Sequence, residues 1–426
     1  MDRAQPDAPL SRVHIVGAGL AGLAAAVALA RANVPATLYE ASPAAGGRAR
    51  SYFDSRLSCR LDNGNHLLLS GNHAVHSYLG TVGALATMAE HQARFPFFEQ
   101  QSGERWVLTP SRGRLPWWIL LPSRRLPGSR ARDYLGLLAL RRAGPETTVA
   151  EMLGGTPLYR RLVTPLTVAM LNTAPERASA SLLAAVLAQS LFAGERACRP
   201  FLPKQGLSES LVDPALAWLR LRGGRIATSC RVTALHFHQN HLAGLTTTEE
   251  AIVLGRNEAA ILAVPPWIAT SLLPGLPAPD EFEAIVNLHF RPASLLPSEP
   301  FLGVLGGTAE WVFAKGRILS VTVSAANRLL DEPAEALAAL VWSELQTALG
   351  LRESLPPFRV VKERRATFAA TPSVRRLRPD ASWPRAQGLA GNLALAGDWT
   401  ATGLPSTIEG AIRSGFAAAR VLLDRG

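Results

Sequence analysis

The chain has 426 residues, more than one simple hydrophobic core accommodates, so two or three domains are expected. Hydrophobic residues make up 48% of it, and glycine and proline recur without a short period, which excludes a disordered or collagen-like protein. The net charge of +11 comes from scattered arginines that form no basic stripe with stacking aromatics, so nucleic acid is not an expected partner.

The cysteines and the apolar runs bear on the cellular compartment. Cys59, Cys198 and Cys230 form no close-spaced pair, so neither a disulfide framework nor a metal site is expected, which suits a reducing cytoplasm. A glycine-rich motif stands where a cleavable leader would end, so export is not expected. No uncharged apolar stretch reaches the roughly 20 residues that span a bilayer, and we expect no transmembrane segment.

A unit of strand, turn, helix and strand is expected near the N-terminus. Residues 12–16 form a short apolar run typical of a buried parallel strand, and residues 21–32 form a helical segment rich in alanine and leucine. The next apolar run, residues 34–39, ends at Glu40. An acidic residue about 20 positions after the turn is placed to accept hydrogen bonds from ribose hydroxyls. The unit therefore predicts a bound dinucleotide.

The turn between the first strand and the helix is rich in glycine. Gly17 permits a tight turn, Gly19 lets the main chain approach a pyrophosphate, and Gly22 lets the helix and strand pack closely. The N-terminus of the helix then faces the phosphate charge. A glycine-rich turn alone is weak evidence, but here the whole unit around it is present.

Two polar turns follow this unit. Gly46 and Gly47 would let the main chain run beside an extended cofactor, and Arg48 would offer a guanidinium to a phosphate or to the edge of the cofactor's ring. An ordinary surface loop is the alternative. Residues 62–66 form a second polar turn that either lines a site or is only a turn.

The middle of the chain, residues 80–200, is predicted to be mainly helical and irregular. Within it, residues 117–122 form an aromatic and aliphatic segment. The arginines that flank it are Arg112, Arg114, Arg124, Arg125, Arg130 and Arg132. Such a wedge can grip an anionic bilayer surface. A core-facing segment of a second domain is the alternative.

Strand patterns return in the second half of the chain. We expect residues 223–266 to rejoin the nucleotide-binding domain, because their hydrophobic runs need a sheet to join. Residues 280–370 are assigned to a substrate domain. The elements expected there are strands at 285–290, 311–313 and 318–323 and a helix at 333–349.

The C-terminal region predicts a second part of the site. Residues 392–399 form a buried strand that runs into Gly397 and Asp398, and residues 404–411 begin a final helix. The Asp398 carboxylate can bond a ribityl chain. The amides where the helix begins, at Thr407 and Ile408, can stabilise the negative charge of a reduced flavin.

Several of these motifs resemble the amine-oxidase and phytoene-desaturase superfamily of FAD enzymes. The matching motifs are, in chain order, GAGLAGL, Glu40, GGR, the VPP at 264–266 and AGDW with its IEGA helix. The resemblance implies an α/β fold with a Rossmann-type FAD-binding domain and a discontinuous α+β substrate domain. We assign residues 1–78, 201–270 and 386–426 to the FAD-binding domain, 79–200 to a helical substrate and membrane-facing part, and 271–385 to the substrate domain.

A narrower resemblance covers five segments, at 162–180, 287–290, 310–313, 362–372 and 396–415. They are similar to the hydroxysqualene dehydroxylases of bacterial hopanoid biosynthesis. This implies reduction of hydroxysqualene to squalene with loss of water. From the segment at 117–122 and its arginines we expect a cytoplasmic protein that binds the inner face of the cytoplasmic membrane. The resemblance also implies that FAD is held by Gly17, Gly19, Gly22, Glu40, Gly46, Gly47, Arg48, Val232, Gly397, Asp398, Thr407 and Ile408.

Val232 and Thr407 differ from the other positions in what the sequence says about them. Val232 rests only on its place in a strand that would contact adenine. Thr407 stands where monoamine-type oxidases place an aromatic residue that helps to cage the amine, so an amine substrate is disfavoured.

The implied reaction needs a proton donor for the leaving hydroxyl and a dry apolar tunnel. The candidate donors are Asp62, His66, Glu363 and Glu409, although Glu363 also reads as an ion-paired structural residue and Glu409 as a helix-start residue. The aromatics that either line the tunnel or form plain core are Trp311, Phe313, Phe368 and Trp399.

The source of electrons and the direction of reaction stay open at this stage. No second glycine-rich unit that would bind a nicotinamide nucleotide is found in the middle of the chain, so the electrons are expected from an external reductant, either a partner reductase or a nicotinamide nucleotide in transient contact. The rival functions are a carotenoid-type isoprenoid desaturase and a non-catalytic flavin-bearing carrier of triterpenes.

Overall fold

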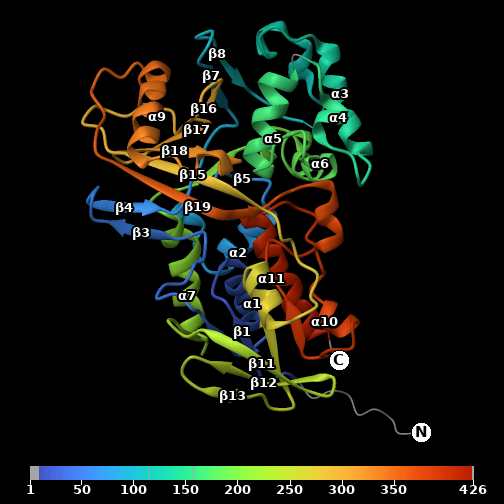
Figure 1. Ribbon diagram of the computed structural model, residues 1–426. Helices are drawn as coiled ribbons and strands as arrows, with labels where there is room; N and C mark the ends of the chain where they lie inside the picture. The colour runs from blue at the N-terminus through green and yellow to red at the C-terminus, as the bar shows by residue number, and fades with distance from the viewer. Residues whose placement is uncertain (1–8, 114, 157, 425–426) are drawn as a thin grey trace.

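The computed structural model describes residues 9–113, 115–156 and 158–424. Two main sheets define the molecule, with a parallel sheet in the lower part of Figure 1 and a larger mixed sheet in the upper part. Arg114, one of the flanking arginines of the expected membrane wedge, lies outside the described residues.

The parallel sheet gathers strands from four distant parts of the chain. Its order is β10 (Arg225–Ala227), β2 (Ala36–Tyr39), β1 (Arg12–Val16), β14 (Glu258–Leu262) and β20 (Leu393–Leu395). All neighbouring pairs are parallel. The inner strands are almost wholly buried, as expected of a parallel sheet with both faces covered. The first predicted strands and the rejoining of the sheet by residues 223–266 are confirmed by β1, β2, β10 and β14.

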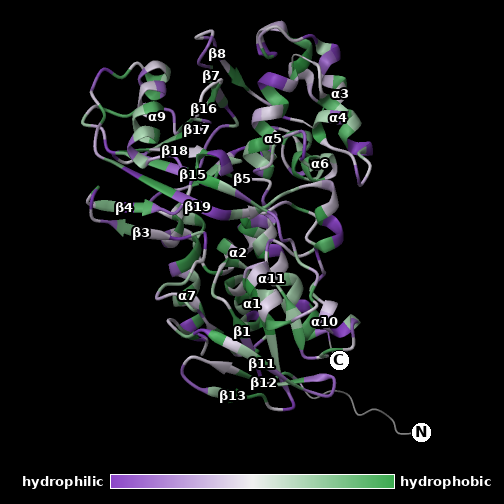
Figure 2. Cartoon of the chain, in the orientation of Figure 1, coloured by the Kyte–Doolittle hydropathy of each residue, from purple (hydrophilic) through white to green (hydrophobic). Residues whose placement is uncertain are grey.

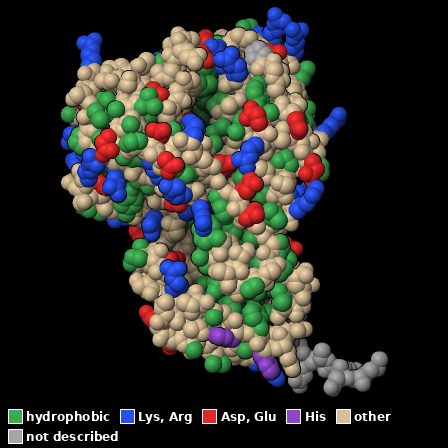
Figure 3. Space-filling view, viewed as in Figure 1, with side chains coloured by type: hydrophobic (Ala, Val, Ile, Leu, Met, Phe, Trp, Pro, Cys, Tyr) green, Lys and Arg blue, Asp and Glu red, His purple; other side chains and the backbone are tan. Residues whose placement is uncertain are grey.

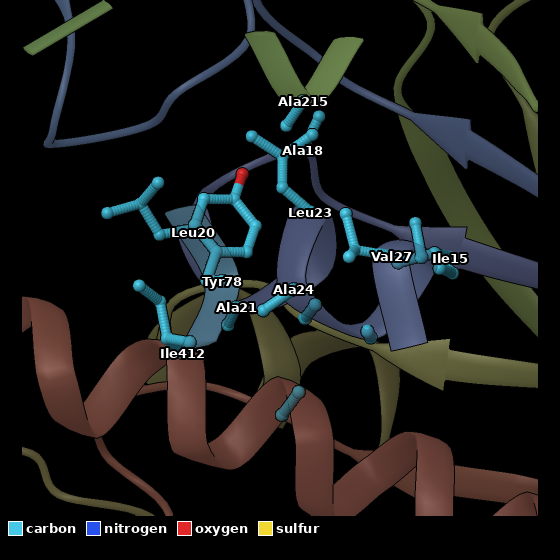
Figure 4. Packing of buried hydrophobic residues seen from close by; sticks show 14 of the residues in the cluster. Ile15, Ala18, Leu20, Ala21, Leu23, Ala24, Val27, Tyr78, Ala215 and Ile412 are labelled. Atoms are coloured by element: carbon cyan, nitrogen blue, oxygen red, sulfur yellow. The ribbon is translucent and has the colours of Figure 1, made fainter. Parts of the chain in front are cut away.

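Helices cover this sheet closely. They are α1 (Leu20–Arg31), α2 (His73–Thr81), α7 (Asp213–Arg220) and α11 (Ile408–Leu423). A Cβ on Gly415 of α11 would overlap the Ala21 carbonyl of α1, so the two helices touch through their main chains. Figure 4 shows the side chains of α1 between Ile15 of β1 and Ile412 of α11. The first and last helices of the chain therefore form one core.

Part of the segment 223–266 forms a sheet of its own. The strands β11 (Val232–His238), β12 (His241–Thr247) and β13 (Ala251–Val253) form a separate antiparallel sheet instead of entering the parallel one. Gln239 adopts a φ of 52° between β11 and β12, which is the backbone that a tight hairpin requires. This local turn pairs the two strands with each other.

The mixed sheet forms the upper part of the molecule. Its order is β19 (Phe358–Phe368), β15 (Phe282–Phe290), β18 (Ile318–Val323), β17 (Trp311–Lys315), β16 (Phe301–Leu305), β7 (Phe95–Glu99) and β8 (Arg105–Leu108). Only the β16–β7 pair is parallel. The apolar stripe of α9 (Ala334–Leu349) packs on one face, around Trp342. The strands and helix expected within 280–370 are confirmed.

Residues 80–200, predicted to be mainly helical and irregular, also contain strands. Besides β7 and β8, the strand β6 (Met88–Glu90) pairs with β9 (Pro200–Pro203), which also receives β5 (Leu68–Leu69). Aromatic residues such as Phe97 and Trp106 favour strands, and they stack here on one face of the sheet. The remaining chain is helical, with α3 (Leu135–Ala139), α4 (Val149–Leu153), α5 (Thr164–Leu171) and α6 (Ala180–Gln189).

The shorter elements connect the two sheets. The hairpin of β3 (Ser51–Asp54) and β4 (Cys59–Asp62) lies between them, and α8 (Pro266–Leu272) and α10 (Trp383–Ala386) follow β14 and β19. Among the described helices, none is long and apolar enough to cross a membrane. The described residues also contain no cluster of His, Cys, Asp or Glu that would hold a metal ion.

The segment 117–122 is divided between the core and the surface. Trp118 is 3% exposed and meets the Tyr134 ring edge to face at 5.0 Å, whereas Trp117 is 61% exposed. The 3-10 turn at Trp117–Leu120 points the two neighbours in different directions. Trp118 therefore belongs to the core, and membrane binding by the exposed part of the segment stays a prediction.

Candidate functional site

The glycine-rich turn after β1 packs so closely against neighbouring main chain that two of its positions have no room for a side chain. Gly17 has a φ of 101°, and a Cβ there would lie 2.5 Å from the Ala263 carbonyl oxygen after β14. A Cβ on Gly22 would overlap the carbonyl oxygen of Gly17. Any side chain at either position would push α1 away from the sheet.

Gly19 differs from these two positions. It precedes α1 with an ordinary φ of −72°, and a Cβ there would meet no atom within 4 Å. The loop with the glycine pair lies against it, since the Gly46 N–H donates to the Ala18 carbonyl at 2.8 Å and Gly47 has a φ of 57°. We call Gly19, Gly46 and Gly47 the glycine cradle. An open space walled by main chain at a helix N-terminus fits a pyrophosphate.

Glu40 lies at the carboxyl end of β2, beside the same turn. Its carboxylate accepts hydrogen bonds from the main-chain N–H groups of Ala18 at 2.9 Å and Ser42 at 2.8 Å. The carbonyl of Glu40 accepts from Cys230 at 2.9 Å, and Val232 begins β11 two residues later. The structure thus brings Glu40 and Val232 to one edge of the sheet, next to the glycine cradle.

Arg48 joins the glycine pair to the C-terminal strand. Its guanidinium forms an ion pair with Asp398 at 2.6 Å and donates to the Ala366 carbonyl at 2.6 Å. The Ser406 hydroxyl donates to the other carboxylate oxygen of Asp398. Burial acts to raise the pKa of Asp398, but the Arg48 charge and the Ser406 hydroxyl outweigh it and hold that pKa below its ordinary value. Asp398 is therefore ionised at neutral pH.

Arg378 was missed by the sequence reasoning. This buried side chain donates to the carbonyls of Trp399 and Thr400 at 3.2 and 3.0 Å and to the Asp398 carbonyl at 3.1 Å. Its guanidinium also lies 4.8 Å from the Phe368 ring centroid. Burial lowers the pKa of Arg378 to about 10, although the Asp398 charge opposes this. The residue holds the Gly-Asp-Trp turn in place from behind.

The turn after β20 ends at the start of α11. Gly397 has a φ of 147°, its N–H donates to the Ser414 hydroxyl at 2.8 Å, and a Cβ there would overlap the Trp399 indole. The Thr407 hydroxyl accepts from the Gly410 N–H and caps α11, whose first residue is Ile408. A side-chain cap at this position satisfies one orphan amide of the helix.

Asp62 and His66 lie on the side of the site that faces the mixed sheet. Asp62 accepts from the Ser51 hydroxyl at 2.6 Å and the Leu207 N–H at 2.9 Å, and it pairs with Lys315 of β17 at 2.8 Å. Burial lowers the pKa of His66 to about 4; the Asp62 charge opposes this and the Arg48 charge adds to it. His66 is thus neutral at pH 7 and close to both Asp62 and Arg48.

The structure does not bring the other two donor candidates to this place. Glu409 is buried, and its two oxygens accept from the Ala74 and Val75 N–H groups at 3.0 Å each, at the start of α2. Arg413 pairs with it at 2.8 Å. Glu409 therefore ties α11 to α2. Glu363 lies half-buried in β19, opposite Ile285 of β15.

The four aromatics of the expected wall belong to, or pack against, one hydrophobic cluster but have different nearest partners. Trp399 is buried and donates to the Val264 carbonyl at 2.9 Å, and Phe368 lies under Arg378. Both rings pack around the Asp398 turn. Trp311 and Phe313 instead contact Phe301 in the mixed sheet, with ring centroids 6.2 and 6.1 Å apart. Whether these rings line a tunnel or are plain core stays a prediction.

These features together fit a dinucleotide that carries a flavin. The glycine cradle and the N-terminus of α1 suit its pyrophosphate, Glu40 its ribose, and the Arg48 and Asp398 pair lies where the mixed sheet meets the parallel one. The fold and site thus define a flavin-dependent oxidoreductase, with the reacting end of the cofactor expected between the two sheets.

Comparison with known proteins places the chain within this class. Residues 20–423 match the family model described as "Flavin containing amine oxidoreductase". Because the match spans nearly the whole chain, the protein belongs to the flavin-containing amine oxidoreductase family. FAD is its cofactor.

Two curated relatives are similar over nearly their whole length. Hydroxysqualene dehydroxylase of Rhodopseudomonas palustris is 46% identical over 97% of this chain and 99% of its own length. Hydroxysqualene dehydroxylase of Sinorhizobium fredii is 45% identical over 97% and 98%. A crystal structure described as a putative protoporphyrinogen oxidase from Exiguobacterium is 17% identical, with a TM-score of 0.67 over 96% of this chain and 98% of that one. The last likeness concerns the fold alone.

Proposed function

We propose that this protein is an FAD-dependent enzyme that reduces hydroxysqualene to squalene with loss of water. The observation that carries the proposal is the 45–46% identity to two hydroxysqualene dehydroxylases over 97% of the chain. The capped start of α11 at Thr407 supports it, because a threonine there leaves no aromatic cage for an amine.

Most of the cofactor is held by main-chain groups in this proposal. The glycine cradle and the first amides of α1 bind the pyrophosphate, Glu40 accepts from the ribose hydroxyls, and Val232 contacts the adenine. Arg48 and Asp398 orient the part of the cofactor that lies between the sheets, and the first amides of α11 stabilise negative charge there. When bound and reduced, FAD supplies a hydride.

The side chains between the sheets would orient the allylic alcohol and exclude water. Asp62 and His66 are the candidates that lie nearest Arg48, and neutral His66 can donate or accept a hydrogen bond at the leaving oxygen. Glu363 and Glu409 are less suited, because Glu409 is engaged by two main-chain N–H groups and Arg413. An allylic carbon loses its hydroxyl readily once the oxygen is protonated, since the adjacent double bond stabilises the cation.

A single anaerobic experiment tests the reaction. Photoreduced protein is mixed separately with hydroxysqualene, phytoene and squalene, and the products are identified by mass spectrometry. We expect squalene from hydroxysqualene and reoxidised flavin in equal amounts. Free reduced FAD without protein is the control. Oxidation of phytoene by the oxidised protein would instead identify a desaturase, and substrate binding without turnover would identify a carrier.

We also propose that the electrons come from an external reductant. Anaerobic mixing with NADH or NADPH alone should leave the flavin absorbance unchanged. An added flavodoxin-type or ferredoxin-type reductase should bleach the flavin within the same time. Fast bleaching by the nicotinamide alone contradicts this part of the proposal.

A further proposal is reversible binding to the cytoplasmic face of the membrane through one surface. This surface consists of the exposed apolar residues Leu115, Trp117, Leu120, Leu121, Leu135 and Leu138. Around them stand the arginines of the same segment, and Figure 2 shows hydrophobic and hydrophilic residues side by side along α3 and α4. Exposed apolar side chains ringed by arginine suit an anionic lipid surface.

The two neighbouring tryptophans provide a matched test. Trp117→Ser should lower co-sedimentation with anionic vesicles and leave thermal stability unchanged, because its ring is exposed. Trp118→Ser should lower thermal stability, because it empties part of the core beside Tyr134. Unchanged vesicle binding by the Trp117→Ser protein would remove the proposed surface.

A further inference from the structure

A recess opens at the edge of the mixed sheet, beside α5. Its volume is about 160 Å³. The side chains that define it are Phe97, Arg160, Pro165, Val168, Glu310 and Trp311. Figure 3 shows a hollow between the two upper lobes with hydrophobic side chains on its walls. Glu310 is thus an acidic group in a recess that has both apolar and polar walls.

Glu310 directly precedes β17 and is held by the residue that follows β18. Its carboxylate accepts from the Ser324 N–H at 2.7 Å. Burial raises the pKa of Glu310 to about 7, although Ser324 and the Arg328 charge act to lower it. Arg160 is the other charged side chain of the recess. A large share of Glu310 therefore carries its proton at neutral pH.

Two short chains of contacts connect Glu310 to the flavin side. Ala325, next to Ser324, donates its N–H to Asn172 at 2.6 Å, and Asn172 donates to Thr367 at 2.9 Å. The neighbour of Thr367 is Ala366, whose carbonyl receives the Arg48 guanidinium.

The second connection runs along β18. The Asn65 amide, next to His66, donates to the Thr322 hydroxyl at 3.0 Å. Ser324 is two residues further on, about 7 Å at the rise of an extended strand. Thr322 is also the register partner of Trp311, which lines the recess. Glu310 and the polar turn at 62–66 thus flank the same part of the sheet.

We propose that Glu310 is the acid that protonates the leaving hydroxyl of an allylic alcohol bound in this recess. The inference rests on the proposed function and deepens it. The carboxyl transfers its proton to the hydroxyl oxygen, the C–O bond breaks with both electrons going to oxygen, and water leaves. The allylic carbon takes a hydride from the reduced flavin to form the new C–H bond. The flavin is thereby oxidised, and its remaining proton returns to the Glu310 carboxylate.

Glu310→Gln in the holoenzyme tests this assignment. It should lower kcat about 10²- to 10⁴-fold, the usual contribution of an acid catalyst, with FAD content retained. Wild-type kcat should fall as pH rises through about 7, because the proton is lost, and the variant should lack this ionisation. Glu310→Asp should restore part of the rate and keep an ionisation. Infrared spectra of FAD-free protein should show a protonated carboxyl that disappears on the same pH rise and is absent from the Gln variant.

Glu344→Gln is the matched control. Glu344 accepts from the Thr308 and Ala309 N–H groups near the same end of β17, but it does not line the recess. Its replacement should leave the pH profile of kcat unchanged. If the wild type makes squalene and the Glu310→Gln protein keeps the wild-type rate and pH profile, the assignment of Glu310 is wrong but the proposed function stands. A wild type that makes no squalene overturns the proposed function and this assignment with it.

Discussion

The parallel sheet and the mixed sheet build their parts of the site by different means. At the parallel sheet, Gly17 and Gly22 leave no room for a side chain, and the binding surface is main chain. At the mixed sheet, side chains such as Asn172 and Glu310 form the polar contacts. A cofactor common to a whole family is thus met by backbone geometry, whereas the region assigned to the substrate depends on individual side chains.

Among the substitutions that test this comparison, Gly22→Ala should cause the largest loss in the free energy of unfolding. A Cβ there would overlap the Gly17 carbonyl, and neither main-chain segment can move without opening the sheet. We expect a loss of about 3 kcal/mol or more in the free energy of unfolding. Thermal unfolding of the FAD-free protein measures it.

Gly19→Ala is the matched control for that substitution. Its φ of −72° accepts alanine and its Cβ would meet no protein atom, so the stability of the FAD-free protein should not change. FAD binding should nevertheless weaken, because the methyl group would enter the space assigned to the pyrophosphate. Titration with FAD separates the two effects, and equal FAD affinity for the wild type and Gly19→Ala would contradict the cradle.

Arg378→Met should have the next largest effect. It leaves the buried carbonyls of Trp399 and Thr400 without their donor, at a cost of about 3 kcal/mol. Arg378→Lys should rescue little, because an ammonium cannot reproduce the fork of a guanidinium. Arg376→Met, which removes only an exposed pair with Glu146, should cost less than about 1 kcal/mol. Equal stability of the Arg378 and Arg376 variants would show that the turn holds itself.

The pH dependence of stability should distinguish the mixed sheet. The pKa of Glu310 is raised from 4.5 to about 7, so the folded protein binds more protons than the unfolded chain between these values. Its contribution is full below about pH 4.5 and is lost as the pH rises through about 7, a change on the order of 3 kcal/mol. Unfolding of wild type and Glu310→Gln at pH 5 and pH 8 measures it. Parallel curves for the two proteins would show that Glu310 does not titrate there.

The ion pair between Lys315 of the mixed sheet and Asp62 of the β3–β4 hairpin should contribute least to stability. Lys315→Met removes the partner of Asp62, but both side chains are partly exposed, so we expect a loss of about 1 kcal/mol or less. Chemical denaturation measures this, with Lys315→Arg as the control that keeps the charge. A much larger loss would mean that this contact holds the two sheets together.

The sequence predicted the parallel sheet well because its requirements are local. A glycine that no side chain can replace, a short apolar strand and an acid at a fixed spacing all appear within residues 12–40. The arrangement at the mixed sheet depends on contacts between distant residues, such as Asn172 with Thr367. No local sequence pattern predicts these contacts.

Two residues show why the remaining features escaped prediction. Arg378 looks like one of many surface arginines in a chain with 44 basic residues, and only the fold buries it. Glu310 precedes a strand as many exposed acids do, and its pKa is raised by burial in a recess that α5, remote in sequence, helps to form. The local sequence offers one signal, which is an acidic residue at the start of the run EWVF.

The contact between α1 and α11 has a consequence for biogenesis. The two helices are separated by 376 residues, so a nascent chain that grows at about 5–20 residues per second exposes an unfinished parallel sheet for roughly 20 to 75 seconds. The intervening strands of the mixed sheet emerge from the ribosome during that interval. Flavin insertion is therefore a late step of maturation, and a chaperone that shields α1 until the last helix is made would serve this protein well.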